Sequence, residues 1–157
     1  FTTLYPNLGV ANVDEDEYII ADVPGLIKDA HKGTGLGHRF LGHVERCELL
    51  LHLIDISSSK IYDDYEVIIN ELKNYDSSIN KKKRILVFTK CDVFDEIEIK
   101  KIKEFLKKKK IDDGFFISSV TGKNILKLSR HINDIIKKQK ILKNNIIDEK
   151  ENKNWTP

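Results

Sequence analysis

The sequence predicts an α/β fold with a mostly parallel sheet, and two observations lead to this class. Apolar segments of strand length alternate along the chain with longer segments of helical period, a pattern typical of strands joined by helical crossovers. Residues 49–56 form a nearly continuous apolar run, as expected of a strand that is covered on both faces. At 157 residues the chain is long enough for one domain with one sizeable core.

The first half of the chain contains three predicted strands. Residues 8–13 and 18–23 are apolar segments on either side of four acidic residues, which indicates a hairpin-like start. The second strand ends at a Pro-Gly pair, and a glycine-rich loop follows it. A short helix over residues 38–47 then leads into the buried strand over residues 49–56.

The rest of the chain alternates between helices and strands. Residues 97–109 are expected to be helical because their apolar side chains recur at helical spacing. The other expected elements are a helix over 61–75, a strand over 84–88, a short strand over 115–117 and a final helix over 125–138. From about residue 140 the sequence becomes polar and rich in Asn and Lys. We therefore expect one domain over residues 1–140 and a weakly ordered tail over residues 141–157.

Composition excludes several classes of protein. Apolar residues make up 40% and charged residues 33% of the chain, so wholly disordered and collagen-like chains are excluded. No apolar run approaches the roughly 18–20 residues that span a bilayer. The two cysteines, Cys47 and Cys91, form no CxxC pair, so the sequence predicts neither a disulfide framework nor a zinc site. A reducing cytoplasm fits this composition best.

Charge is distributed unevenly between the two halves. Residues 1–80 contain 6 Lys or Arg and 14 Asp or Glu, whereas residues 81–157 contain 21 and 11, so the halves carry −8 and +10. A basic half of this kind fits a surface that faces nucleic acid. Lysine-rich, solvated helix faces explain such runs better, so the charge runs do not decide the function.

Three loops carry motifs with possible chemistry, since ligands of open α/β sheets bind beyond the carboxyl ends of the strands. The first motif is Asp22-Val23-Pro24-Gly25, at the end of an apolar strand. A carboxylate there can hold the water of a metal ion, and a glycine three residues later lets a backbone N–H approach a phosphate. The alternative is a simple turn that ends the strand.

The second motif is Thr89-Lys90-Cys91-Asp92, which follows the apolar strand over residues 84–88. The Asp92 carboxylate can accept two hydrogen bonds, from the ring N–H and the exocyclic amine of guanine, and adenine lacks this pair of donors. The aliphatic stem of Lys90 can lie along the purine face. The alternative is a solvated turn in which Asp92 caps the next helix.

The third motif is Ser118-Ser119-Val120-Thr121-Gly122, between a short strand and a helix. Its backbone N–H groups can meet the carbonyl oxygen of guanine. Since the backbone supplies these donors, the side chain of Ser119 is only loosely constrained. Taken alone, the motif fits a strand-to-helix turn with a serine cap equally well.

The order of the three motifs, DxxG, TKxD and SSxxG, resembles the G domain of GTPases of the translation-factor class. More narrowly, the segments FTTLYPNLGV, DVPGLIKDAHKGTGLGHRF and LLHLIDIS are similar to the Obg (CgtA) family. The resemblance covers about residues 1–140 and is most specific over residues 1–56. It implies a sheet like that of P-loop NTPases, with helices on both faces.

The resemblance also implies a role for each matching residue. Thr3 would reach Mg²⁺ and the γ-phosphate, Asp22 would hold Mg²⁺ through water, and Gly25 would donate to the γ-phosphate. Thr3 and Asp22 are thus the implied metal-binding residues. The implied nucleotide-binding positions are Thr2, Thr3, Asp22, Val23, Pro24, Gly25, Thr89, Lys90, Cys91, Asp92, Ser118, Ser119 and Val120.

Three positions depart from the pattern of such GTPases. Thr89 stands where the family usually has asparagine, and Ser119 stands where it usually has alanine, so we expect weaker affinity for guanine rather than lost specificity. Leu26 follows DxxG where many GTPases have a glutamine that orients the attacking water. Because leucine cannot hydrogen-bond that water, the resemblance implies slow hydrolysis of GTP.

A phosphate-binding loop of the form GxxxxGK[ST] does not occur in the 157 residues. We therefore expect the chain to be an N-terminally truncated G domain, without its P-loop, its central first strand and the glycine-rich N-terminal domain of Obg proteins, and inactive as an enzyme without that loop. The family places the absent strand between residues 18–23 and 49–56. We expect either a gap beside the strand over 18–23 or its direct pairing with the strand over 49–56.

The expected function is that of an Obg-type GTP-binding protein, a magnesium-dependent switch that acts with GTP and GDP in the assembly of the large ribosomal subunit. The resemblance implies a cytoplasmic protein whose partners are guanine nucleotide and the large subunit or its RNA, and whose complete form is a monomer. A catalytically inactive RNA- or ribosome-binding module is the alternative. An Obg-like ATPase is disfavoured, because an adenine site has no use for the Asp92 carboxylate.

Overall fold

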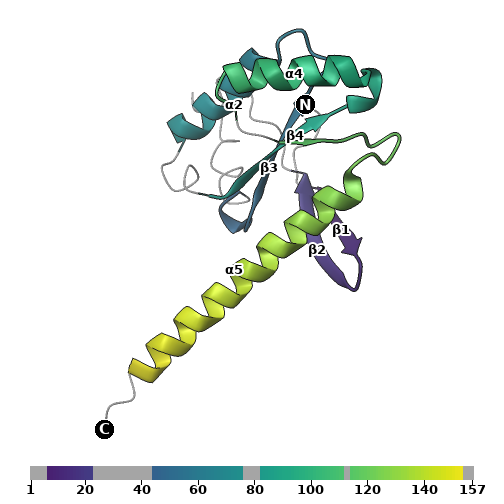
Figure 1. The fold of residues 1–157 in the computed structure, drawn as a ribbon. Coiled ribbons are helices and arrows are strands. Elements are labelled where there is room, and N and C mark those ends of the chain that lie inside the picture. Colours follow the sequence, from purple (N-terminus) through teal and green to yellow (C-terminus); the bar gives the residue numbers. More distant parts are fainter. Residues whose placement is uncertain (1–6, 23–43, 76–81, 112–113, 154–157) are drawn as a thin grey trace.

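The computed structural model describes residues 7–22, 44–75, 82–111 and 114–153 (Figure 1). This part of the chain contains five strands, three α-helices that span at least three turns, and a short 3₁₀ segment. In chain order they are β1 (Asn7–Val13), β2 (Asp16–Asp22), β3 (Leu50–Asp55), α2 (Ile61–Tyr75), β4 (Arg84–Thr89), η2 (Cys91–Val93), α4 (Glu96–Lys108), β5 (Phe115–Phe116) and α5 (Ile125–Lys153).

Strands β3, β4 and β5 form a parallel sheet in that order. Leu50 pairs with Arg84 at one end and Asp55 pairs with Thr89 at the other, while β5 pairs only with Val87 and Phe88 of the middle strand. Four consecutive residues of β4 are buried, as expected of a central strand covered on both faces. The predicted α/β class and parallel sheet are therefore confirmed.

Helices cover both faces of this sheet (Figure 1). On one face α2 and α4 pack on a cluster that includes Ile54, Phe88 and Leu106. On the other face α5 and the β1–β2 hairpin pack on a second cluster, to which Val87 and Ile132 belong. The sheet is thus the middle layer of three, and its carboxyl edge is left for the loops.

The strands β1 and β2 form a separate antiparallel hairpin. Asp14, in the turn between them, has a φ of 55°, a left-handed conformation that Asp adopts more readily than most residues. In the described part of the chain, no backbone pairing joins β2 to β3. Of the two expected outcomes for the strand over residues 18–23, direct pairing with the strand over 49–56 is therefore not found among the described residues.

Polar contacts and burial fasten the hairpin to α5. The Arg130 guanidinium donates two hydrogen bonds to the Asp14 carboxylate, at 2.9 and 2.7 Å. Asp16 accepts a hydrogen bond from the Asn133 amide at 2.9 Å and pairs with Lys137. Because Val13 and Tyr18 are buried beside the same helix, the hairpin belongs to the core although its strands do not join the sheet.

Helix α5 continues past the predicted end at residue 138 to Lys153. Its sequence contains neither Gly nor Pro between residues 125 and 153, so no residue type in it stops a helix. Lys143, beyond the predicted end, pairs with Glu48 just before β3. None of the helices described is long and apolar enough to cross a membrane.

Candidate functional site

The loops after β3, β4 and β5 meet at the carboxyl edge of the parallel sheet. Backbone hydrogen bonds continue beyond the strands, from Ile56 N to Thr89 O at 3.3 Å and from Cys91 N to Ile117 O at 3.1 Å. These bonds hold the segments that carry the second and third motifs next to each other. The two motifs were expected at one edge of the sheet, and the parallel pairing of β4 and β5 brings them there.

Lys90 begins the loop after β4 in a strained conformation, with φ 62° and ψ 34°. This left-handed geometry is uncommon for a residue with a side chain. The Lys90 ammonium lies 2.6 Å from Oδ2 of Asp55, at the end of the neighbouring strand. The ammonium is therefore anchored at the sheet edge, while the side chain remains 59% exposed.

Asp55 is the carboxylate that organises this corner. Its Oδ1 accepts hydrogen bonds from the backbone N–H of Ser57 at 2.9 Å and from the Ser57 hydroxyl at 2.6 Å. The Lys90 ammonium, followed by the Ser57 hydroxyl, holds the pKa of Asp55 below its ordinary value. Asp55 thus stays ionised and keeps its attraction for Lys90 at neutral pH.

Thr89 and Cys91 support the loop and point away from its exposed side. The Thr89 hydroxyl donates to the backbone carbonyl of Ile54 at 3.3 Å. Cys91 is 1% exposed and belongs to the core cluster beneath α4. The hydrogen bond of the half-buried Thr89 and the burial of Cys91 help to position the loop.

Asp92 is exposed and makes no hydrogen bond or ion pair with any residue that the structure describes. The predicted alternative, that Asp92 caps the following helix, is wrong. The cap is Asp95, whose carboxylate accepts from Glu98 N at 2.8 Å, while the Glu98 carboxylate accepts from Asp95 N at 3.0 Å. This reciprocal cap holds the far end of the loop and leaves the Asp92 carboxylate open to a ligand.

The third motif is a turn with a buried base and an exposed tip. Ser118 is fully buried, and its hydroxyl accepts a hydrogen bond from Thr121 N at 3.1 Å, which closes the turn. Helix α5 begins only at Ile125, so this bond is not the serine cap of a helix that was expected as an alternative. Ser119 and Val120 at the tip are exposed, Val120 by 88%. Within the described residues their backbone N–H groups donate to no acceptor. These N–H groups can therefore donate hydrogen bonds to water or to a bound ligand.

The first motif is only partly described. Asp22 is the last residue of β2 and is exposed, as the prediction of a carboxylate at this strand end requires. Thr2, Thr3, Val23, Pro24 and Gly25 lie outside the described residues. The side of the site that the resemblance assigns to phosphate and Mg²⁺ is therefore represented in the structure by Asp22.

Sequence reasoning missed Asp55 and Ser57. The loop after this strand lies at the expected edge of the sheet, but its Asp55-Ile56-Ser57 segment matches no nucleotide motif. A signal is present in the residue types, because an aspartate followed two residues later by a serine often forms a local side-chain turn. The ion pair to Lys90 has no such signal.

Comparison with known proteins decides the family. The family model described as 50S ribosome-binding GTPase matches residues 1–90. GTPase Obg of Wolbachia pipientis subsp. Culex pipiens (strain wPip) is 53% identical over 106 residues, which are 68% of this chain and 32% of that protein. GTPase Obg of a Wolbachia species (subsp. Brugia malayi, strain TRS) is 42% identical over 148 residues, 94% of this chain and 43% of that protein. The chain belongs to the Obg family of GTPases.

A further Obg relative and two solved structures agree with this assignment. GTPase Obg of Rickettsia massiliae (strain Mtu5) is 44% identical over 88% of this chain and 42% of that protein. Era in complex with MgGDPNP and nucleotides 1506–1542 of 16S ribosomal RNA superposes with a TM-score of 0.60 at 25% identity, over 83% of this chain and 44% of that one. A variant of Aquifex aeolicus Era bound to GDP·AlF₄⁻ gives 0.61 at the same identity and coverage.

These comparisons confirm the predicted Obg resemblance and the predicted fold. This Obg-family chain spans 32–43% of the length of the curated relatives it matches. The sheet edge that carries Lys90, Asp92 and the Ser118–Val120 turn is therefore part of a GTPase fold.

Proposed function

We propose that this chain supplies the guanine-recognising part of a GTP-binding protein that acts as a switch in assembly of the large ribosomal subunit. The observation that carries the proposal is the carboxylate of Asp92, which lies on the same sheet edge as the backbone N–H groups of Ser119 and Val120. None of these groups has a partner among the residues that the structure describes. All three groups are exposed, so they can exchange water for a ligand, and these acceptors and donors match the edge of one base.

The arrangement favours guanine over adenine. The Asp92 carboxylate accepts from the ring N–H and the exocyclic amine of guanine, and the N–H groups of Ser119 and Val120 donate to its carbonyl oxygen. Adenine offers neither the pair of donors nor the carbonyl oxygen. The exposed stem of Lys90, anchored through its ammonium to Asp55, supports the purine face.

The phosphate end of the nucleotide requires residues outside the described part of the chain. Asp22, a carboxylate at a strand end, is an oxygen donor of the kind that Mg²⁺ prefers, and Thr3 is the second proposed ligand. When bound, Mg²⁺ neutralises charge on the phosphate oxygens. We propose that Asp22 holds Mg²⁺ through water and that the backbone of Gly25 donates to the γ-phosphate.

Hydrolysis by such a site is expected to be slow. Leu26 offers no hydrogen bond to an attacking water, in contrast to the glutamine of other GTPases. The 157 residues also contain no GxxxxGK[ST] motif, whose lysine and backbone donors supply much of the electrostatic stabilisation in phosphoryl transfer. Slow turnover suits a switch, in which the bound nucleotide is the signal.

The test is the base preference of Asp92 in this chain joined to an amino-terminal segment that carries a phosphate-binding loop. Asp92→Asn should weaken GTP binding about tenfold to a hundredfold, as expected for a lost pair of bonds worth about 1–3 kcal/mol. The same change should improve binding of xanthosine triphosphate, whose 2-oxo group is an acceptor. Glu96→Gln, at the start of α4, is the matched control. Equal GTP affinity of Asp92→Asn and unchanged protein in calorimetry would remove Asp92 from the site.

A second candidate function is an RNA- or ribosome-binding module that works without nucleotide. The observation that favours it is the run of exposed lysines on α4, where Lys100, Lys101, Lys107 and Lys108 make no ion pair with a described residue. RNA affinity that falls steeply with salt and does not depend on GTP would support this module.

A further inference from the structure

A hollow of about 340 Å³ opens at the end of the sheet opposite the candidate nucleotide loops. It lies between α2, the beginning of β4 and α5, where Arg84 starts the strand whose other end carries Thr89. The six polar or aromatic residues of its lining are Tyr65, Lys82, Lys83, Arg84, Phe115 and His131. Its volume is at the lower end of the roughly 300–1,000 Å³ typical of ligand sites.

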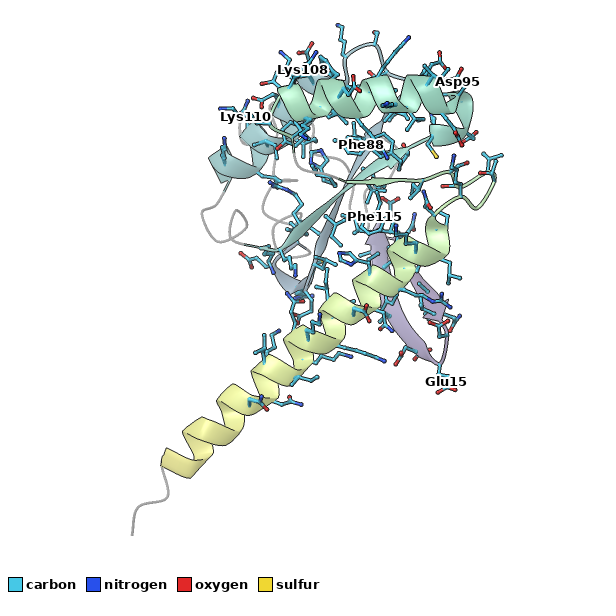
Figure 2. All side chains as sticks on the ribbon, viewed as in Figure 1. Glu15, Phe88, Asp95, Lys108, Lys110 and Phe115 are labelled. Carbon is cyan, nitrogen blue, oxygen red and sulfur yellow. The ribbon has the colours of Figure 1, made fainter. Side chains whose placement is uncertain are left out.

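The hollow exists because the edge strand is short. Strand β5 pairs only with Val87 and Phe88, so the first residues of β4 have no strand beside them on that side. Phe115, the first residue of β5, lies between the sheet and α5 (Figure 2). The short edge strand therefore contributes to the opening beside the first residues of β4.

The lining is cationic and contains no carboxylate. The Lys82 ammonium is occupied, because it donates to the backbone carbonyls of Glu45 and Cys47 at 2.8 and 2.7 Å. Lys83 and Arg84 make no ion pair or hydrogen bond through their side chains with the described residues. Two cations thus remain available to an anionic ligand at the rim of the hollow.

Aromatic rings lie beside these cations in fixed positions. Phe115 and His131 are in contact, with ring centroids 5.1 Å apart and planes inclined by 40°. On the other wall Tyr65 stacks on the buried ring of His52, at 5.6 Å and 8°. Since Tyr65 is backed by a buried ring and Phe115 is half-buried, little side-chain freedom is lost when a flat ligand stacks on either.

We propose that this hollow binds single-stranded RNA, with phosphates on Lys83 and Arg84 and an unstacked base against the Phe115–His131 pair. Cations alone would fit any polyanion, but rings next to them fit an unpaired base, whose stacking contributes about 1–3 kcal/mol. A duplex presents its bases already stacked and is bound across its outer surface. The inference rests on the ribosome-related part of the proposed function and adds a place on this chain where RNA binds.

The test measures fluorescence anisotropy of a labelled single-stranded RNA of mixed sequence with the whole chain. The double variant Lys83→Gln, Arg84→Gln should weaken binding at least tenfold and reduce the slope of log K against log salt by about 0.7 for each phosphate that is no longer neutralised. Phe115→Leu should weaken binding about fivefold or more with the slope unchanged, as expected for stacking. Circular dichroism melting of each variant establishes that it is folded.

The matched control removes two charges elsewhere, through Lys60→Gln and Lys123→Gln in loops near the opposite edge of the sheet, where both side chains are exposed. This control should change the affinity less than twofold. Equal losses in the two double variants, absence of RNA binding by the unchanged chain, or equal affinity for duplex RNA would overturn the inference. Displacement of RNA by an equal concentration of an acidic peptide would overturn it in favour of a protein partner. None of these residues takes part in the Asp92 experiment, so the two proposals fail separately.

Discussion

Lys90 reaches from the loop after β4 to the carboxylate of Asp55, with 2.6 Å between Nζ and Oδ2. The two residues are 35 positions apart in sequence, and the register Asp55↔Thr89 brings them together. Lys90 also has a positive φ of 62°. The ion pair thus starts from a residue whose backbone conformation is rare for lysine, directly before the residue pair Cys91-Asp92.

Asp55→Asn is expected to weaken guanine binding several-fold with little effect on folding. An exposed ion pair contributes little to stability, so the melting temperature should stay nearly unchanged, whereas the freed Lys90 no longer supports the purine face. Nucleotide titration together with thermal unfolding, in the chain joined to a phosphate-binding segment, measures both quantities. Asp63→Asn in the first turn of α2 removes the same charge as a control. Identical affinities for the two variants would show that the pair has no role in binding.

The change of stability with pH should contain a contribution from His52. Burial, with a smaller effect of Arg84, lowers the pKa of His52 from 6.5 to about 4, and neither ring nitrogen has a partner in the described structure. The folded protein therefore binds fewer protons than the unfolded chain between these values. The free energy of unfolding should have its full value above pH 6.5. It should fall by on the order of 2–3 kcal/mol as the pH drops toward 4.

The variant His52→Phe keeps a ring on Tyr65 and removes the two unpartnered nitrogens. It should be more stable than the unchanged chain, since an unpaired buried polar group is costly, and it should lose the His52 part of the pH dependence. Urea unfolding at several pH values between 4 and 7.5 measures this difference. His131→Gln, at an exposed position, should retain the original profile. A profile for His52→Phe that runs parallel to that of the unchanged chain would contradict the prediction.

Gly114 allows the chain to pass close to the core before β5. A Cβ at this position would lie 2.7 Å from the carbonyl oxygen of Leu86 and 2.7 Å from the buried ring of Phe88. Gly114→Ala should therefore destabilise the fold by about 1–3 kcal/mol through overpacking. Gly9→Ala is the control, because a Cβ at Gly9 meets nothing within 4 Å. Equal denaturant midpoints for Gly114→Ala and Gly9→Ala would show that the core around Gly114 can shift to make room for a methyl group.

The docking of the hairpin on α5 predicts a coupling between Asp14 and Arg130. Asp14→Asn removes the charge and keeps a residue type that tolerates the left-handed turn. Because the pKa of Asp14 is lowered chiefly by its hydrogen bond from Arg130, this stabilisation is present at neutral pH and is lost as the pH falls through the lowered pKa. In a double-mutant cycle with Arg130→Gln, the loss for the double variant should be smaller than the sum of the single losses at pH 7. Strict additivity would mean that the two-bond contact contributes nothing.

Local pattern was sufficient for much of the fold and for the family. Strand and helix periodicity depends on near neighbours in sequence, so the alternation and the apolar strand before Asp55 could be read directly. The motifs that point to guanine are also local, and each occupies a loop that the parallel register brings to one edge. Asp92 and the Ser119–Val120 tip were predicted as ligand-facing, and the structure leaves their polar groups open.

Contacts between distant segments were decided only by the tertiary structure. Cys91 belongs to a motif, yet it is 1% exposed and packs in the core cluster that includes Leu106 of α4. The ion pair between Lys90 and Asp55 joins the loop after β4 to β3, and the rings beside Arg84 come from a strand and two helices. Contacts of this kind cannot be predicted from the spacing of residues in the sequence. The extent of α5 was likewise open, since a polar sequence without Gly or Pro permits a helix but does not require one. The sequence by itself therefore determined which elements form and which family they belong to, and the packing of those elements decided which side chains are free to bind.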